Sequence, residues 1–221
     1  MTLELIDTTR EIENKIHYAI LVHLDNALKK SVPQIEQDVS TRLKQIFISS
    51  PEYLSLTTGG KLSVELGIPG DVALRLLDKV INTFADSLVV DLKDIKSWGS
   101  LARGFFPMNI YIHETVIDKI IALPESSYLS NQRRVDWMEW LLTKGNQVIL
   151  ANFKIQYGNY AQVDFSRTGG AIMIEGGTWR IPPEFAGTYN DNWITRAIDN
   201  NARFLQDLIT ASIKRNIEKN I

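Results

Sequence analysis

The sequence predicts an α+β fold with an N-terminal helical hairpin, a small antiparallel sheet with a β-hairpin, and a long C-terminal helix. Two kinds of pattern lead to this prediction. Apolar residues recur at helical spacing near both ends of the chain, and they alternate with polar residues in several short segments between them. The chain has 221 residues, which is enough for one hydrophobic core, with or without a smaller helical subdomain.

The N-terminal region predicts two helices. A stripe with a spacing of four residues, typical of a buried helix face, is formed by Ile12, Ile16, Ile20, Leu24 and Leu28. Proline is tolerated in the first turn of a helix and not in its interior, so we expect the first helix to stop at Pro33 and a second one to start there. We therefore assign residues 1–56 to a helical hairpin and residues 57–221 to an α+β core with the terminal helix, or the whole chain to a single domain.

The central region predicts a mixture of elements. Helical periodicity covers residues 73–84 and 133–144, and Gly145 stands where a left-handed C-terminal cap is usual. Alternation predicts strands at residues 87–93 and 109–113, with a long irregular connection from Trp98 to Pro107. The segment 61–68 fits neither pattern clearly.

The C-terminal third predicts strands followed by a helix. Residues 149–157 alternate, and Val163 and Phe165 continue the pattern. Residues 171–175 and 178–181 flank two glycines and predict a tight hairpin, which Pro182 and Pro183 end because proline cannot donate into a strand ladder. The pattern over residues 191–219 predicts one long helix, with Thr188 or Asn190 as its N-cap.

Composition narrows the possible functions. The chain has no cysteine, which excludes disulfides, thiolate metal sites and a cysteine nucleophile and fits assembly in a reducing cytoplasm. The net charge of -2 lacks the basic excess typical of nucleic-acid or anionic-lipid binding, so we expect any contact with DNA to be local or passive. We expect no signal peptide and no membrane span, because neither a basic N-terminal segment nor a sufficiently long apolar run is present.

Catalytic and metal-binding patterns are weak. His17 and His23 are six residues apart, whereas two metal ligands on one helix face are usually three or four apart, and His113 has no ligand-type neighbour at such a spacing. Ser166 lacks the flanking glycines of a nucleophile elbow, and the glycines after it lack the spacing of a phosphate-binding loop. We therefore expect no enzyme activity, no metal and no cofactor, and keep a hydrolase using Ser166, Arg167 and a carboxylate as the weaker alternative.

Aromatic, proline and arginine residues are the architectural and assembly candidates. Trp137 and Trp140 share a helix face, which favours core packing first and interface packing second. Trp179 and Trp193 flank the Pro182-Pro183 pair. The three arginines of this region are Arg167, Arg180 and Arg196. For all three we favour structural or assembly contacts over phosphate binding, and for Arg196 we expect a carboxylate partner.

Four motifs in the last 85 residues give a resemblance to a known family. They are DWMEWLL from Asp136, SRTGGAIM from Ser166, WRIPPEFAGT from Trp179 and NWITRAI from Asn192. The region resembles the neck or tail-completion proteins, which join head to tail in long-tailed bacteriophages. The first 135 residues resemble them only loosely, and none of the motifs is specific for catalysis.

The resemblance implies a structural virion protein that is assembled in the host cytoplasm. Such a protein would form a homo-oligomeric ring, hexameric or dodecameric, between the head connector or adaptor and the tail-terminator or tube proteins. DNA would pass only passively through its channel. A tail terminator or a sheath-anchoring virion protein is the alternative, because these share the ring geometry but not the position.

Overall fold

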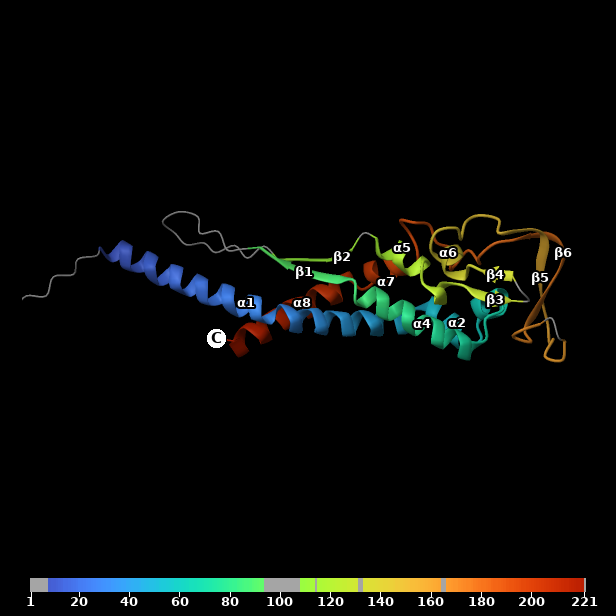
Figure 1. Cartoon of the computed structure of the whole chain (residues 1–221), viewed down its shortest axis with the longest axis horizontal. Coiled ribbons are helices and arrows are strands. Elements are labelled where there is room, and N and C mark those ends of the chain that lie inside the picture. Colours follow the sequence, from blue (N-terminus) through green and yellow to red (C-terminus); the bar gives the residue numbers. More distant parts are fainter. Residues whose placement is uncertain (1–7, 94–107, 114, 131–132, 164–165, 221) are drawn as a thin grey trace, which may run out of the picture. The chain divides into compact units, whose positions relative to one another are not determined.

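The computed structural model describes residues 8–93, 108–113, 115–130, 133–163 and 166–220, and it confirms the α+β class. Contacts between Cα atoms divide the chain into two compact units. Unit 1 comprises Met1–Ser40, Leu88–Ile112 and Arg203–Ile221, and unit 2 comprises Thr41–Ser87 and His113–Ala202. The elements are coloured along the sequence in Figure 1.

The N-terminal element is a single helix, α1 (Thr9–Ile48), so the predicted helical hairpin is wrong. Pro33 lies inside α1 and is exposed. The stripe predicted to be buried is buried only at Leu28, since Ile16 and Ile20 are 53% and 51% exposed. The buried face continues from Ala27 and Leu28 before the proline to Ile35 after it, which keeps the helix intact.

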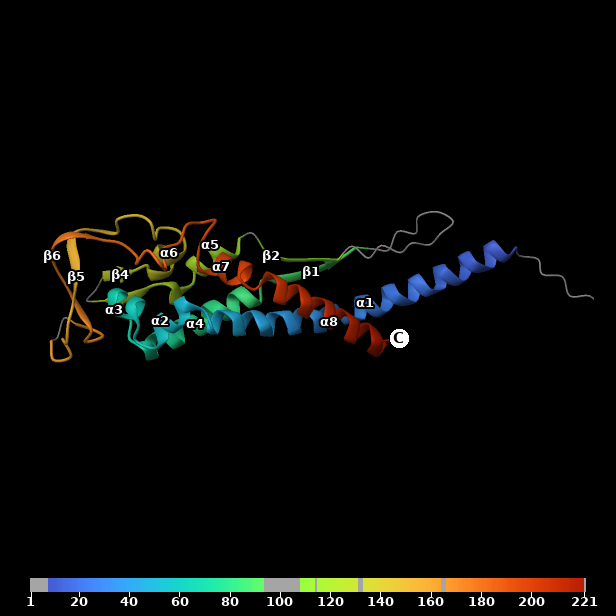
Figure 2. The ribbon, with the colours of Figure 1, turned by 180° about the vertical axis from the view of Figure 1, so that it is seen from behind.

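Unit 1 combines α1 with a β-hairpin and the C-terminal helix. The predicted strands are confirmed as β1 (Leu88–Leu92) and β2 (Met108–Ile112), which pair antiparallel with Val90 opposite Ile110. The connection predicted from Trp98 to Pro107 lies outside the described residues. Helix α8 (Ala202–Asn220) lies beside α1 in both views (Figures 1 and 2), and Ser212 donates a 2.6 Å hydrogen bond to Asp38.

Unit 2 is built around helix α4 (Gly70–Ala85), which confirms the helix predicted at residues 73–84. Its buried face includes Leu77 and Phe84, and the Phe84 ring packs edge-on against Phe47 with centroids 4.7 Å apart. The ambiguous segment 61–68 forms α3 (Lys61–Leu66), which ends at Gly67 in the left-handed conformation. Unit 2 also contains the elements α2 (Pro51–Thr57), α5 (Val116–Ile121) and the 3₁₀ turn Pro124–Ser126.

Helix α6 is shorter than predicted. It spans Trp137–Leu142, and the residues before it form strand β4 (Arg133–Val135), which pairs with β3 (Tyr128–Ser130). Periodicity alone could not show this pairing, because it depends on a partner strand earlier in the chain. The expectation for Gly145 is also wrong, since Gly145 does not have the positive φ of a left-handed cap. A side chain is instead excluded there by the backbone of Ala186 and Gly187.

The two glycines of β6 form a bulge rather than the predicted hairpin turn. Strand β6 runs unbroken over Ala171–Trp179 and pairs antiparallel with β5 (Leu150–Tyr157), which confirms the strand predicted at residues 149–157. Gly176 and Gly177 have positive φ and lie opposite the single residue Asn152, where the register shifts. Over the described residues 158–163 and 166–170, the chain turns, so the strand predicted around Val163 is not formed there.

The predicted terminal helix is interrupted. Helix α7 (Trp193–Asp199) and helix α8 are separated by Asn200 and Asn201. The predicted caps Thr188 and Asn190 are replaced by Asn192, whose side chain accepts from the backbone N–H groups of Ile194 (2.9 Å) and Thr195 (3.2 Å). Thr195 in turn accepts from the backbone of Asn192, which completes a capping box.

Replacing Gly145 with alanine should destabilise the protein by about 2 kcal/mol, as expected for overpacking against backbone that cannot move cheaply. A Cβ atom at residue 145 would lie 2.8 Å from the Ala186 Cα and closer still to the Gly187 nitrogen. Urea unfolding followed by circular dichroism measures the change. Lys144→Ala is the control and should cost less than about 1 kcal/mol, because it removes a partly exposed ion pair with Glu139. Equal costs for the two variants would contradict the close approach.

Candidate functional site

All nine residues selected from the sequence belong to unit 2, and five of them lie in two sites, a pocket and a polar network. Trp140, Arg167 and Trp179 line a pocket. Trp193 and Arg196 belong to a separate polar network at the start of α7. The remaining four are Trp137 and Pro182, which are buried, and Arg180 and Pro183, which are exposed.

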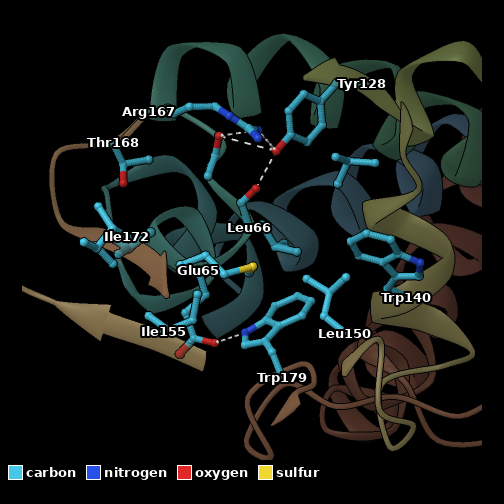
Figure 3. A pocket seen from close by; sticks show the side chains of 15 residues that line it. Glu65, Leu66, Tyr128, Trp140, Leu150, Ile155, Arg167, Thr168, Ile172 and Trp179 are labelled. Atoms are coloured by element: carbon cyan, nitrogen blue, oxygen red, sulfur yellow. Dashed lines mark hydrogen bonds between the residues drawn. The ribbon is translucent and has the colours of Figure 1, made fainter. Parts of the chain in front are cut away.

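The pocket has a volume of about 200 Å³ and is enclosed mainly by apolar side chains. Helix α3 contributes one wall, the β5–β6 ribbon a second, and Trp140 of α6 part of a third (Figure 3). The rings of Trp140 and Trp179 meet edge to face with centroids 6.1 Å apart. The aliphatic lining consists of Val64, Leu66, Val135, Leu150, Ile155, Ala171 and Ile172, together with Met173.

One end of the pocket is formed by Arg167 and Tyr128. The guanidinium Nη1 donates to the Tyr128 hydroxyl and to the Gly67 carbonyl at 3.4 Å, and its carbon lies 5.3 Å from the centre of the Tyr128 ring. The Tyr128 hydroxyl donates to the carbonyl of Leu66 at the end of α3. Burial raises the pKa of the Tyr128 phenol above its ordinary value, although the positive charge of Arg167 opposes this. The tyrosine therefore stays neutral and links α3 to the arginine.

The opposite end of the pocket contains Glu65. Its Oε2 accepts a 2.8 Å hydrogen bond from the Trp179 indole, and its Oε1 accepts one from the Tyr157 hydroxyl. Burial, then the hydrogen bond and the negative charge of Glu65, raise the pKa of the Tyr157 phenol well above its ordinary value, so this hydroxyl remains a donor. Both carboxylate oxygens thus have a donor from the β5–β6 ribbon.

Ser166, the residue on which a hydrolase would depend, is used by the backbone. Its hydroxyl donates to the Ala171 carbonyl at 2.7 Å and accepts from the Gly169 N–H at 3.1 Å. These bonds shape the turn that leads into β6. Ser166 is not part of the pocket lining.

The described residues include no group of three or more histidine, aspartate or glutamate side chains that could hold a metal ion. His113 lies 2.9 Å from the Thr115 hydroxyl, in a local contact two residues along the chain. His17 and His23 are exposed on α1.

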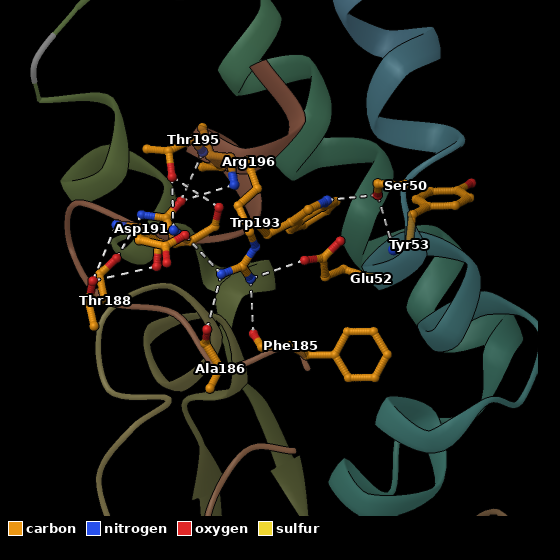
Figure 4. A network of polar contacts seen from close by, with 12 residues as sticks. Ser50, Glu52, Tyr53, Phe185, Ala186, Thr188, Asp191, Trp193, Thr195 and Arg196 are labelled. Carbon is orange, nitrogen blue, oxygen red and sulfur yellow. Dashed lines mark hydrogen bonds and ion pairs between the residues drawn. The ribbon is translucent and has the colours of Figure 1, made fainter. Parts of the chain in front are cut away.

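The polar network at the start of α7 fixes a loop against helix α2. Arg196 donates to the Glu52 carboxylate at 3.1 Å, to Asp191 at 3.1 Å and to the carbonyls of Ala186 (3.1 Å) and Phe185 (3.3 Å) (Figure 4). The carboxylate partner expected for Arg196 is therefore confirmed. The Glu52 side chain is only 7% exposed, whereas that of Asp191 is 73% exposed, so the pair with Glu52 is the one that matters for stability.

Trp193 anchors the same region in the core. It is 1% exposed, its indole donates a 2.7 Å hydrogen bond to the Ser50 hydroxyl, and its ring packs edge-on against Phe47 with centroids 5.6 Å apart. Ser50 also caps α2, because its hydroxyl accepts from the Tyr53 N–H. The tryptophan thus links the start of α7 to the junction between α1 and α2 (Figure 4).

The sequence did not indicate which residues would be the partners of Trp179, Arg167 and Arg196. Glu65, Tyr128 and Glu52 stand in segments without a recognisable motif, and each meets its partner across 39 to 144 residues of chain. The single signal for Glu52 was its place in the first turn after Pro51, which indicates a helix start and not an ion pair.

In the part of the chain that the structure describes, no helix combines the length and the apolar character needed to cross a membrane. Comparison of the chain with protein-family models, with curated proteins and with solved structures found no match.

Proposed function

We propose that the chain is a structural virion protein of a tailed phage, a neck or tail-completion subunit that self-associates into a ring. The observation that carries this proposal is the apolar surface on the first half of α1. This surface is formed by Ile16 and Ile20, which lie one turn apart on the same face of the helix and are 53% and 51% exposed. Tyr18 (61%) and Val22 (41%) are exposed on the opposite face. Grouped exposed apolar residues mark surfaces that other proteins cover.

A second copy of the chain is the partner that this surface fits best. The helix segment around it carries both signs of charge, with Glu11, Glu13 and Asp25 against Arg10 and Lys15, so two copies can approach without strong repulsion. A head-to-tail contact between copies closes into a ring when its rotation divides a full turn evenly. The ring would join the head connector to the tail and leave a channel through which DNA passes.

The network around Arg196 and Trp193 supports a structural role in another way. It holds the start of α7 against α2 through buried groups, and rigid elements keep the angular error between ring subunits small. Its polar groups bind one another and the backbone, which leaves Arg196 few donors for phosphate. The resemblance of the last 85 residues to neck proteins points in the same direction.

Two other functions remain as alternatives. A tail terminator or sheath-anchoring virion protein would use the same exposed face of α1 at another position in the particle. A hydrolase is less well supported, because the Ser166 hydroxyl is engaged by two backbone groups of its own turn.

The double variant Ile16→Lys/Ile20→Lys should abolish self-association, because it places a charge at both residues of the apolar surface of α1. We expect wild-type protein at about 100 µM to form a defined oligomer, and the double variant to be monomeric with an association constant at least about 100-fold lower, the equivalent of about 2.7 kcal/mol. Sedimentation velocity with multi-angle light scattering measures both.

Leu74→Lys is the matched control, since Leu74 is an exposed leucine (47%) of a different helix, α4, which belongs to unit 2. It should leave the oligomer unchanged. A wild-type chain that stays monomeric at every concentration, or an oligomer that the double variant forms equally well, would contradict the proposal.

A further inference from the structure

The pocket in unit 2 has the size of one large side chain. Its volume of about 200 Å³ is below the roughly 300–1,000 Å³ of pockets that hold drug-sized ligands. Its walls are two indole rings and aliphatic side chains, the surroundings in which an aromatic or aliphatic anchor of a protein partner is usually buried.

The charge at the pocket favours an acidic group beside that anchor. Only Nη1 of Arg167 has hydrogen-bond acceptors among the described residues, so Nε and Nη2 are available. The acidic group of the pocket, Glu65, already accepts from the Trp179 indole and the Tyr157 hydroxyl (Figure 3). Arg167 is thus the charged group of the lining with unused donors, and a carboxylate matches its fork of donors.

We propose that this pocket binds a short segment of a partner protein in which a large apolar side chain is followed by an acidic residue. The apolar side chain enters between Trp140, Trp179 and the aliphatic walls, and the carboxylate pairs with Arg167. The pocket belongs to unit 2 and the apolar surface of α1 to unit 1. Binding here can therefore be measured independently of self-association, on the monomeric Ile16→Lys/Ile20→Lys variant as well as on the wild type.

Capped dipeptides test the two parts of this inference separately. The probes are acetyl-Phe-Glu-amide, acetyl-Phe-Gln-amide and acetyl-Ala-Glu-amide, titrated into ¹⁵N-labelled protein. The readout is the indole N–H resonance of each tryptophan, because Trp140 and Trp179 line the pocket whereas Trp137 and Trp193 bind Glu125 and Ser50 elsewhere. The Phe-Glu probe should shift the Trp140 and Trp179 resonances and leave those of Trp137 and Trp193 in place.

The expected affinities follow from the exposure of the groups. Removing the acidic charge in Phe-Gln should weaken binding about fivefold, a modest factor because Arg167 is exposed. Removing the ring in Ala-Glu should weaken it more than about tenfold, since the ring supplies most of the buried apolar area.

Variants of the pocket complete the test. Arg167→Gln should bind Phe-Glu and Phe-Gln equally, Arg167→Lys should keep part of the preference, and Met173→Trp, at an exposed position of the lining, should block binding of all three. Arg180→Gln is the matched control, because Arg180 is exposed and outside the lining, and it should bind like the wild type. Absence of shifts with Phe-Glu, equal binding of Phe-Glu and Phe-Gln by the wild type, or unchanged binding in Met173→Trp would overturn the inference.

Discussion

Replacing Trp193 with alanine should lower the free energy of unfolding by about 4 kcal/mol, within the range of buried tryptophan truncations. The side chain is almost wholly buried, contacts the Phe47 ring, and donates its indole proton to Ser50. Its removal leaves a large cavity where α7 meets the end of α1, and chain segments 143 residues apart lose their link. Urea unfolding followed by far-ultraviolet circular dichroism gives the value.

Trp193→Phe separates the two contributions of this side chain. It keeps a ring next to Phe47 and loses the indole hydrogen bond, so we expect a cost of about 1–2 kcal/mol, of which part is the smaller ring. Trp140→Phe is the comparison, because Trp140 is half-buried at the pocket and should cost less than Trp193→Ala. A loss below about 1 kcal/mol in Trp193→Ala would show that this tryptophan is not an anchor.

Replacing Arg196 with methionine should cost about 3 kcal/mol. Methionine keeps the apolar stem of the side chain but leaves the buried Glu52 carboxylate without its cation, and removing one partner of a buried pair typically costs 3–5 kcal/mol. We expect the lower end of that range because Arg196 is 29% exposed. The carbonyls of Phe185 and Ala186 lose their donor as well.

A double-mutant cycle identifies the origin of this cost. Glu52→Gln combined with Arg196→Met should be less destabilising than the sum of the single changes, because no uncompensated charge remains. Asp191→Asn should cost less than about 0.5 kcal/mol, since that partner is largely exposed. Additive single effects would mean that the Glu52–Arg196 pair is not coupled in the folded protein.

The regular spacing of apolar residues predicted some elements close to their observed bounds. Helix α4 and strands β1, β2 and β5 appear close to where the apolar spacing placed them. The helix buries one face, and half-buried and exposed residues alternate along β2, whereas β5 is mostly exposed. The failures are of another kind. Pro33 and the glycine pair of β6 are local signals with two physical outcomes, and whether a proline ends a helix or two glycines turn a strand depends on what packs against them.

The candidate site could be predicted only in part. The tryptophans and arginines stood out by residue type, and Trp140, Arg167 and Trp179 do line one pocket. Nothing in the local sequence indicates that Glu65 would meet Trp179, or that Glu52 would meet Arg196, because such contacts follow from the tertiary fold and not from spacing along the chain. Ser166 stood out for its neighbouring glycines, and those glycines belong to its turn.

Cryo-electron microscopy of the particles made from the genome that encodes this chain tests the central proposal most directly. The proposal predicts a closed ring of this protein between the head connector and the tail, with the residues around Ile16 and Ile20 of each copy covered by a neighbouring copy. Particles that lack the chain, or that hold it as separated single copies with this face of α1 exposed to solvent, would contradict it.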